Sequence, residues 1–395
     1  MEDNGQHYVV RRFLAFHNLV FGKTWPLWLA GLVIGFLSVV RFVWDKPWGV
    51  VAGIRNWGDW FFNLIGVYTK PIESPVTSTE SLTVAGLILG SFASALAGRE
   101  FGFRIPPFLE AVKGAIAGVF MGIGAALARG CNVGGFFEAI ASFSLGGLAM
   151  AAGLIPGVYI GLKYLLWEME TFPAKGYSVP RGGQRSRFDW TIFQPWLGYG
   201  ILLLGVVSAF FYASSAYTKS GVVLVLSMAM GVVFHRARLC FVAAFRDPFM
   251  TGDSQQTKAM LIATMVATVG YSMVKWSGIR PETSYVVNTF GLGGLLGGFV
   301  FGIGMVLAGG CGSGTLWRFG EGQMKLWIVL VTFMFSNSIL RYYMEVTGYI
   351  NRLGLAIFIP DLITYKWALI ATLAFLGLWY LLVDWNEERQ VFVIK

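Results

Sequence analysis

The chain of 395 residues is strongly apolar, with 56% hydrophobic and 13% charged residues, which is about half the charged fraction of a typical soluble domain. Its net charge of +9 does not indicate nucleic-acid binding, because the basic residues lie in short connections rather than on one soluble face. This composition excludes a soluble globular protein and predicts a protein that crosses a membrane many times.

Apolar runs follow one another along the chain, and most approach the roughly 20 residues that a helix needs to cross a bilayer. They cover residues 27–43, 81–98, 111–128, 143–167, 196–217, 220–234, 258–276, 291–308, 325–340 and 364–383. Backbone groups in a bilayer must be satisfied within the protein, and the alternating pattern of a β-barrel is absent. We therefore expect an all-α polytopic membrane protein.

The connections between these runs indicate domain organisation and orientation. The polar stretch 168–195 predicts a cytoplasmic linker between a first transmembrane half with its N-terminal extension, 1–167, and a second half, 196–395. The tryptophan-rich segment 41–67 predicts an amphipathic interfacial segment. Basic connections and the lack of a visible cleavable signal peptide predict a bacterial or archaeal inner (plasma) membrane, with the N-terminus in the cytoplasm.

Residues 114–135 repeat as residues 294–315 without a gap, and ten of the 22 aligned positions are identical. Each copy carries glycine at every fourth residue, which predicts close packing against another helix. Each copy then breaks at a cysteine between glycines, in "RGCNVGG" at 129–135 and "GGCGSGT" at 309–315. Broken helices at matching positions of two repeats are typical of a transport site. We expect two pseudo-symmetric, inverted halves whose broken helices meet at the centre.

A new short helix is predicted after each break, with Asn132 as the N-cap in one copy and Ser313 or Thr315 in the other. The free N–H groups at such helix N-termini suit an anion. A lone buried cysteine is more often a small hydrophobic residue than a ligand. A cysteine that recurs between glycines in both copies favours a role in a transport path.

The third cysteine, Cys240, lies in "FHRARLCFVAAFRDP" at 234–248 among basic residues that attract anions. We expect Cys240 either to be less essential than the other two cysteines or to act at the cytoplasmic mouth. The cysteines have no C-x-x-C spacing, so neither a metal site nor a cofactor is predicted. The predicted substrate path consists of Cys131, Cys311, Cys240, Gly130, Gly134, Gly310, Gly312, Ser313, Gly314 and Asn132. The secondary candidates are Arg238, Arg246, Arg318 and Glu321.

Four stretches, "ARGCNVGGFF", "RLCFVAAFRDPFMTG", "GGLLGGFVFGIGMVLAGGCGSG" and "WRFGEGQ", together resemble the YeeE/YedE family of sulphur-compound membrane permeases, above all its longer YedE-like branch. The resemblance implies a two-half helical protein in which helices plunge to a centre where cysteines face each other. Its YeeE branch imports thiosulfate, and its YedE branch is thought to handle selenium or sulphur species. Cys131, Cys311 and Cys240 match the family's cysteines, whereas the first-half stretch 97–107, taken as the counterpart of Cys240, has none.

The sequence therefore favours a permease for a small sulphur- or selenium-containing anion and not an enzyme. Two alternatives stay open: a channel for another small solute, and a membrane protein that transfers sulphur through a cysteine persulfide. The second lacks a neighbouring thiol in the sequence. The expected partners are the lipid bilayer, the anion and, as the resemblance implies, a TusA-like cytosolic sulphur carrier; nucleic acid is not among them.

Overall fold

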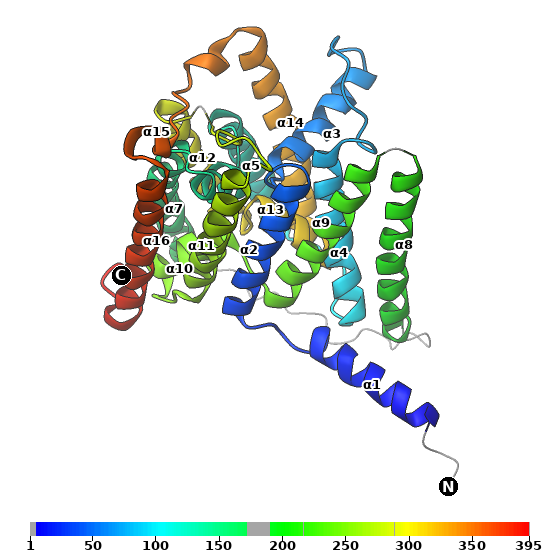
Figure 1. The fold of residues 1–395 in the computed structure, drawn as a ribbon. Helices are drawn as coiled ribbons and strands as arrows, with labels where there is room; N and C mark the ends of the chain where they lie inside the picture. The colour runs from blue at the N-terminus through cyan, green and yellow to red at the C-terminus, as the bar shows by residue number, and fades with distance from the viewer. Residues whose placement is uncertain (1–4, 172–189, 216, 288, 395) are drawn as a thin grey trace.

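The computed structural model describes residues 5–171, 190–215, 217–287 and 289–394, and within these ranges the chain is almost entirely helical (Figure 1). The helices are α1 Gly5–Val20, α2 Leu27–Trp44, α3 Val51–Leu64, α4 Thr79–Ala97, α5 Phe108–Leu127, α6 Glu138–Ala141, α7 Gly146–Thr171, α8 Gln194–Ser214, α9 Thr218–Ala237, α10 Phe241–Met250, α11 Gln255–Trp276, α12 Leu292–Ala308, α13 Gly312–Glu321, α14 Met324–Val346, α15 Ile359–Ile363 and α16 Tyr365–Arg389. A π-helix, η1 Asn132–Phe137, joins α5 to α6.

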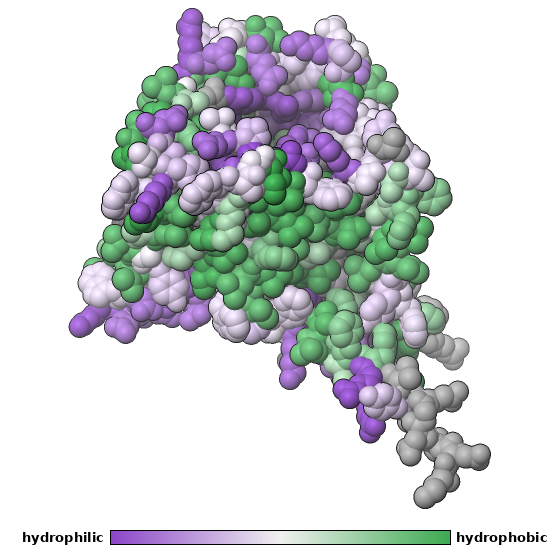
Figure 2. Space-filling view, in the orientation of Figure 1, coloured by the Kyte–Doolittle hydropathy of each residue, from purple (hydrophilic) through white to green (hydrophobic). Residues whose placement is uncertain are grey.

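Ten helices or broken helices among the described residues are long and apolar enough to cross a membrane, which confirms the ten apolar runs. Three of them continue through a break, at Phe108–Ala141, Thr218–Met250 and Leu292–Glu321. Figure 2 shows the corresponding apolar band across the middle of the molecule, with hydrophilic residues gathered beyond it at the end opposite α1. Most of the predicted linker, residues 172–189, lies outside the described residues, so the division of the chain there stays a prediction.

Glycines bring four helices into two close parallel pairs. A Cβ atom on Gly31 of α2 would lie 2.4 Å from the Ala259 carbonyl oxygen of α11, and one turn later Gly35 faces Ala263 in the same way. Helix α4 packs along α9 in the same direction, since Gly86 faces the backbone of Leu224 and, one turn later, Gly90 faces that of Met228. Side chains at these glycines would force the helices apart, so the sequence dictates which helices become neighbours.

The repeated glycines form a second set of parallel pairs. Gly118 and Gly122 of α5 face Val329 and Phe333 of α14. In the other copy, Gly298 and Gly302 of α12 face Met150 and Leu154 of α7. The predicted packing role of both glycine series is confirmed, and each series belongs to a helix pair that joins one half of the chain to the other.

Helices α5 and α12 cross in opposite directions. A Cβ atom on Gly124 would lie 2.5 Å from the Phe301 amide nitrogen, whereas one on Gly304 would lie 2.8 Å from the Met121 amide nitrogen. Higher numbers on α5 therefore face lower numbers on α12. Exchange of the halves converts the α2–α11 pair into α9–α4 and the α5–α14 pair into α12–α7. The predicted inverted pseudo-symmetry, with broken helices meeting at the centre, is confirmed.

The pairing also corrects two expectations. Because α9 and α10 correspond to α2 and α3, the counterpart of Cys240 lies in the α2–α3 connection, 45–50, and not in 97–107. The same connection is not interfacial as predicted for 41–67: Trp48 is completely buried, its indole N–H donates to Ser38 Oγ at 2.7 Å, and its ring packs on Phe234. The sequence alone does not show which helices pack together, so it could not predict that the α2–α3 connection is buried.

Candidate functional site

Each of the three cysteines is the N-cap of a short helix in the interior. Cys131 precedes η1, Cys240 precedes α10 and Cys311 precedes α13, and all three are at most 1% exposed. Cys131 Sγ accepts a hydrogen bond from the Val133 amide at 3.4 Å, and Cys311 Sγ accepts one from the Gly314 amide at 3.2 Å. The thiols are thereby held at helix N-termini, where partial positive charge gathers.

The predicted N-caps Asn132, Ser313 and Thr315 are therefore wrong. Their side chains lie inside the first turn of the new helices, and Asn132 Oδ1 and Thr315 Oγ1 have no hydrogen-bond partner among the described residues. The sulphur atoms occupy the cap position because the chain is already extended at each cysteine, with ψ near −174°.

The first turn of α13 brings the three sulphur atoms together. A Cβ atom on Gly312 would lie 3.0 Å from Cys131 Sγ, and one on Gly314 would lie 3.0 Å from Cys240 Sγ and 3.1 Å from Cys311 Sγ. Cys240 and Cys311 are therefore neighbours, because their sulphur atoms flank the same position on Gly314. Cys240, which we expected at the cytoplasmic mouth, is thus buried beside Cys311. The two thiols are 71 positions apart in the sequence but are neighbours in the fold.

A cavity of about 160 Å³ lies at the end of the bundle opposite α1, and we call it the arginine cavity. It is lined by Gly49, Val50, Val51, Ala52, Arg55, Ala125, Ala126, Arg129, Gly130, Gly134, Tyr285, Asn337 and Arg341. Its floor approaches the first break, because Gly130 and Gly134 flank Cys131 on both sides. The other predicted path residues, Gly310, Gly312, Ser313 and Gly314, are not among its lining residues and lie beyond the cysteines.

Two of the cavity arginines have acidic partners and one does not. Arg55 and Arg341 both bind Glu345, at 3.0 and 2.7 Å. Arg129 forms no hydrogen bond or ion pair among the described residues, although Glu345 attracts it electrostatically, and its backbone is left-handed, with φ of +55°. This conformation ends α5, where the Gly130 amide donates to the Ala125 carbonyl oxygen at 3.0 Å. The guanidinium of Arg129 is left available to an anion.

Two further groups tune the charge of the arginine cavity. Asp59 contacts Arg55 at 3.3 Å, but burial raises the pKa of its carboxyl even though Ser338 and Arg55 act in the opposite direction. Burial also raises the pKa of the Tyr285 phenol, so its hydroxyl keeps its proton and can donate a hydrogen bond. The neutral Tyr285 hydroxyl is a donor that favours an anion in the cavity.

None of the five polar residues in this cavity was among the predicted site residues. Arg129 could have been found, because it directly precedes the glycine of "RGCNVGG". An arginine at the end of an apolar run, such as Arg341, is a second usable signal. Arg55, Tyr285 and Asn337 carry no such signal, since only the fold brings their segments to the first break.

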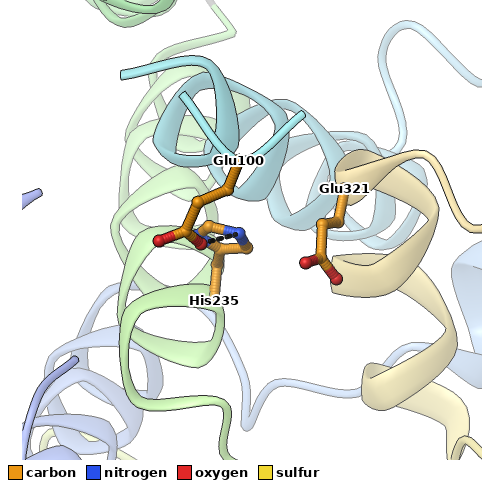
Figure 3. Close-up of side chains that lie close together, drawn as sticks. All are labelled: Glu100, His235 and Glu321. Atoms are coloured by element: carbon orange, nitrogen blue, oxygen red, sulfur yellow. Dashed lines mark ion pairs between the residues drawn. The ribbon is translucent and has the colours of Figure 1, made fainter. Parts of the chain in front are cut away.

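A cluster of ion pairs lies on the other side of the cysteines, at the end of the bundle near α1. Figure 3 shows Glu100 beyond α4, His235 on α9 and Glu321 at the end of α13 pointing toward one another. Arg238 bridges both carboxylates, at 2.9 Å to Glu100 and 3.2 Å to Glu321, and Arg104 binds Glu321 at 3.0 Å. Glu321 has no exposed side-chain surface, so this cluster covers the space beneath α13.

The same cluster has the donor atoms of a metal site, since one ligand atom from each of the three residues lies within 4.8 Å of the others. The carboxylates already accept from guanidinium groups, including Arg236 at 3.1 Å from Glu100. A bound cation would have to compete with those arginines. The residues therefore fit an ion-pair cluster better than a metal centre.

The remaining secondary candidates have local partners. Arg318 donates to the Gly309 carbonyl oxygen at the second break, and its guanidinium lies 4.9 Å from the centre of the Trp317 ring. Arg246 forms an ion pair with the adjacent Asp247 at 2.7 Å. Arg318 thus supports the second break, and Arg246 is paired within α10.

The sequence matches those of known proteins over most of its length. The sequence model of a family described as sulphur transport matches residues 4–160 and 236–393. The chain is 29% identical to "Probable transporter YedE" of Escherichia coli over 344 residues, which cover 82% of each chain. It is also 31% identical to "Thiosulfate transporter TsuA" of Escherichia coli over 180 residues, 42% of this chain and 48% of the other. A second TsuA, from Spirochaeta thermophila, is 36% identical over 26% of this chain and 31% of its own.

Proposed function

Since this chain belongs to the sulphur-transport family, it is a multi-pass membrane protein that transports a sulphur compound, and we propose that its substrate is a small thiosulfate-like anion or a selenium analogue. The partial similarity to two thiosulfate transporters supports thiosulfate as the first candidate. We propose that the anion follows a path lined by Cys131, Cys311 and Cys240.

The observation that carries this proposal is the position of the arginine cavity directly before the cysteines. Arg129 supplies a guanidinium without a partner at the entrance, and Gly134 leaves room beneath Tyr285. Cys131 follows, and the first turn of α13 leads from Cys131 to Cys311 and Cys240. An anion would thus meet a strong charge first and weak donors afterwards.

Thiols at helix N-termini suit the middle of such a path. A neutral S–H donates only weak hydrogen bonds, but its sulphur is polarizable, as is the terminal sulphur of thiosulfate. The helix N-termini add oriented N–H groups and partial positive charge without a full cation. Weak, successive contacts replace part of the hydration shell and still let the anion leave, which conduction requires.

The proposed orientation follows from the loop charges. Basic connections gather at the end of the bundle near α1, so we propose that this end and the N-terminus face the cytoplasm of a bacterial or archaeal inner membrane. The arginine cavity then faces outward, and the ion-pair cluster of Glu100, Arg238 and Glu321 closes the inner end. A TusA-like sulphur carrier would collect the product at that inner end.

Uptake into proteoliposomes that contain only this protein tests the proposal. We expect entry of radiolabelled thiosulfate, with much slower entry of sulfate, which lacks a terminal sulphur. Cys131→Ser and Cys311→Ser should each reduce uptake about tenfold or more while the variants remain monodisperse, and Ser215→Ala, far from the path, should not. Serine keeps the size and loses the polarizable sulphur. Unchanged uptake in both serine variants would favour a channel in which the cysteines only pack.

The contact between Cys240 and Cys311 also favours a second candidate function, sulphur transfer. A thiolate of this pair would attack the outer sulphur of thiosulfate, the S–S bond to the sulfonate would break, and sulfite would leave as the cysteine persulfide forms. Mass spectrometry of the protein after incubation with thiosulfate distinguishes the two functions. A gain of one sulphur atom on Cys240 or Cys311, with release of sulfite, would support transfer, whereas an unmodified protein that carries intact thiosulfate supports transport alone.

A further inference from the structure

A buried carboxyl group lies behind the first break and has no place in the path described so far. Glu138 begins α6, seven residues after Cys131 on the same broken helix, and its side chain is completely buried. The π-helix η1 lies between the two residues, so the carboxyl and the thiol belong to one broken helix and are separated along its axis by η1. An ionisable group inside a membrane-spanning segment is rare and is a functional-site hypothesis in itself.

The carboxyl of Glu138 is only half satisfied. Its Oε2 accepts a hydrogen bond from the Tyr271 hydroxyl, whereas Oε1 has no hydrogen-bond partner. No arginine or lysine nitrogen of the described residues lies within 4 Å of it. Arg41 is the cation within electrostatic reach, but its guanidinium binds Asp45 at 3.0 Å. A buried ion pair does not explain why an acidic residue stands here.

The other titratable groups around Glu138 come from three elements. Helix α11 contributes Tyr271 and, one turn further, Lys275, whose ammonium donates to the Ser142 carbonyl oxygen at 2.9 Å. Helix α2 contributes Arg41. The α11–α12 connection contributes Tyr285, which lines the arginine cavity and is within electrostatic reach of both Glu138 and Cys131. Tyr285 therefore stands between the outer cavity and the buried carboxyl.

We propose that Glu138 is a proton-binding site that couples anion transport to the movement of a proton; this inference rests on the proposed transport function. A proton from water in the outer cavity bonds to a carboxylate oxygen of Glu138, and the same O–H bond breaks when the proton leaves to water on the inner side. An ionised Glu138 repels an anion at Cys131 through the low-dielectric interior, whereas the neutral carboxyl does not. Anion and proton therefore move in the same direction.

A purely structural role makes a different prediction. If Glu138 serves only to accept the hydrogen bond from Tyr271, glutamine supplies the same acceptor in the same shape, and Glu138→Gln should behave as the wild type. If Glu138 binds a proton, glutamine is fixed in the neutral form. The variant should still exchange anions across the membrane but should no longer respond to a proton gradient.

The test compares the wild type, Glu138→Gln and the control Glu170→Gln, an exposed residue near the end of α7, in proteoliposomes at zero membrane potential. The outer pH is held constant, so that Asp59 and the arginine cavity keep their charge, and only the inner pH is raised. Wild type and Glu170→Gln should accumulate radiolabelled thiosulfate, up to about tenfold per pH unit for one proton. Glu138→Gln should equilibrate labelled with unlabelled thiosulfate without accumulation.

Infrared difference spectra of the purified protein between acid and alkaline buffers measure the proton directly and do not depend on transport. We expect a carboxyl band that is present in Glu170→Gln and absent from Glu138→Gln. If Glu138→Gln does not fold, Tyr271→Phe replaces it, because loss of the hydroxyl donor should shift the same band. A carboxyl band that keeps its intensity in Glu138→Gln, or its position in Tyr271→Phe, overturns the inference.

The possible failures are distinguishable. Wild-type uptake of thiosulfate that ignores the inner pH overturns the proton site and leaves the proposed function intact. No thiosulfate uptake in any form of the protein overturns the proposed function, and the infrared band then decides by itself whether Glu138 binds a proton.

Discussion

At the scale of single residues, the unpartnered Arg129 is the clearest target. We predict that Arg129→Gln raises the KM for uptake by about tenfold, because a charge-assisted hydrogen bond to the anion is lost, with a smaller effect on the maximal rate. The salt dependence of KM should weaken as well, since a cation that attracts the anion is removed. The control is Arg352→Gln, an exposed arginine outside the cavity. Equal KM values in the two variants would remove Arg129 from the path.

Gly314 is the second target at this scale. A methyl group there would press on Cys240 Sγ and Cys311 Sγ together, at 3.0 and 3.1 Å, so Gly314→Ala should slow uptake about tenfold while the fold persists. Gly377→Ala on α16 is the matched control, because its added methyl would meet no atom within 4 Å. Uptake that is the same in both variants would show that the path avoids α13.

The residue scale also shows what sequence reasoning can and cannot find. Cys131 and Cys311 could be predicted because a duplicated glycine pattern surrounds both. Their role as N-caps could not, since cysteine is not among the preferred capping residues. The arginine cavity could not be predicted either, because Arg55, Arg129 and Arg341 come from segments that only the inverted pairing of the halves unites.

At the scale of helices, the glycine contacts between α7 and α12 determine stability rather than transport chemistry. A Cβ atom on Gly153 would lie 2.0 Å from the Leu295 carbonyl oxygen, which is backbone and cannot rotate away. We predict that Gly153→Ala destabilises the protein by about 1–3 kcal/mol and lowers its thermal midpoint in detergent by several degrees. Gly200→Ala on α8, where no atom lies within 4 Å, should leave the midpoint unchanged. If Gly153→Ala and Gly200→Ala had the same thermal midpoint, the packing role of Gly153 would be contradicted.

The element scale explains why the ten spans could be predicted from the sequence and their neighbours could not. Hydropathy gives the length of each apolar run, and the glycine spacing shows which face of a helix carries small residues. Neither shows which other helix packs against that face. Gly118 could have packed on any helix, and its contact with Val329 follows only once the two halves are inverted against each other.

At the scale of the whole molecule, every close parallel pair described above joins the first half to the second. We predict that residues 1–180 and 181–395, expressed alone, are degraded or aggregate, because each half lacks the partners of its glycine faces. Expressed together, they should copurify and transport. A cut within α5 provides the control and should abolish assembly. A first half that is monodisperse alone would show that the halves are independent domains.

The inverted pairing has a consequence for biogenesis. A fold that looks nearly the same when turned upside down offers the insertion machinery two orientations with similar burial of apolar surface. The helix core therefore cannot decide which way the nascent chain faces. That decision falls to the basic residues in the loops near α1, since lysine and arginine resist translocation. A few charged residues in these loops thus fix the topology of the entire chain.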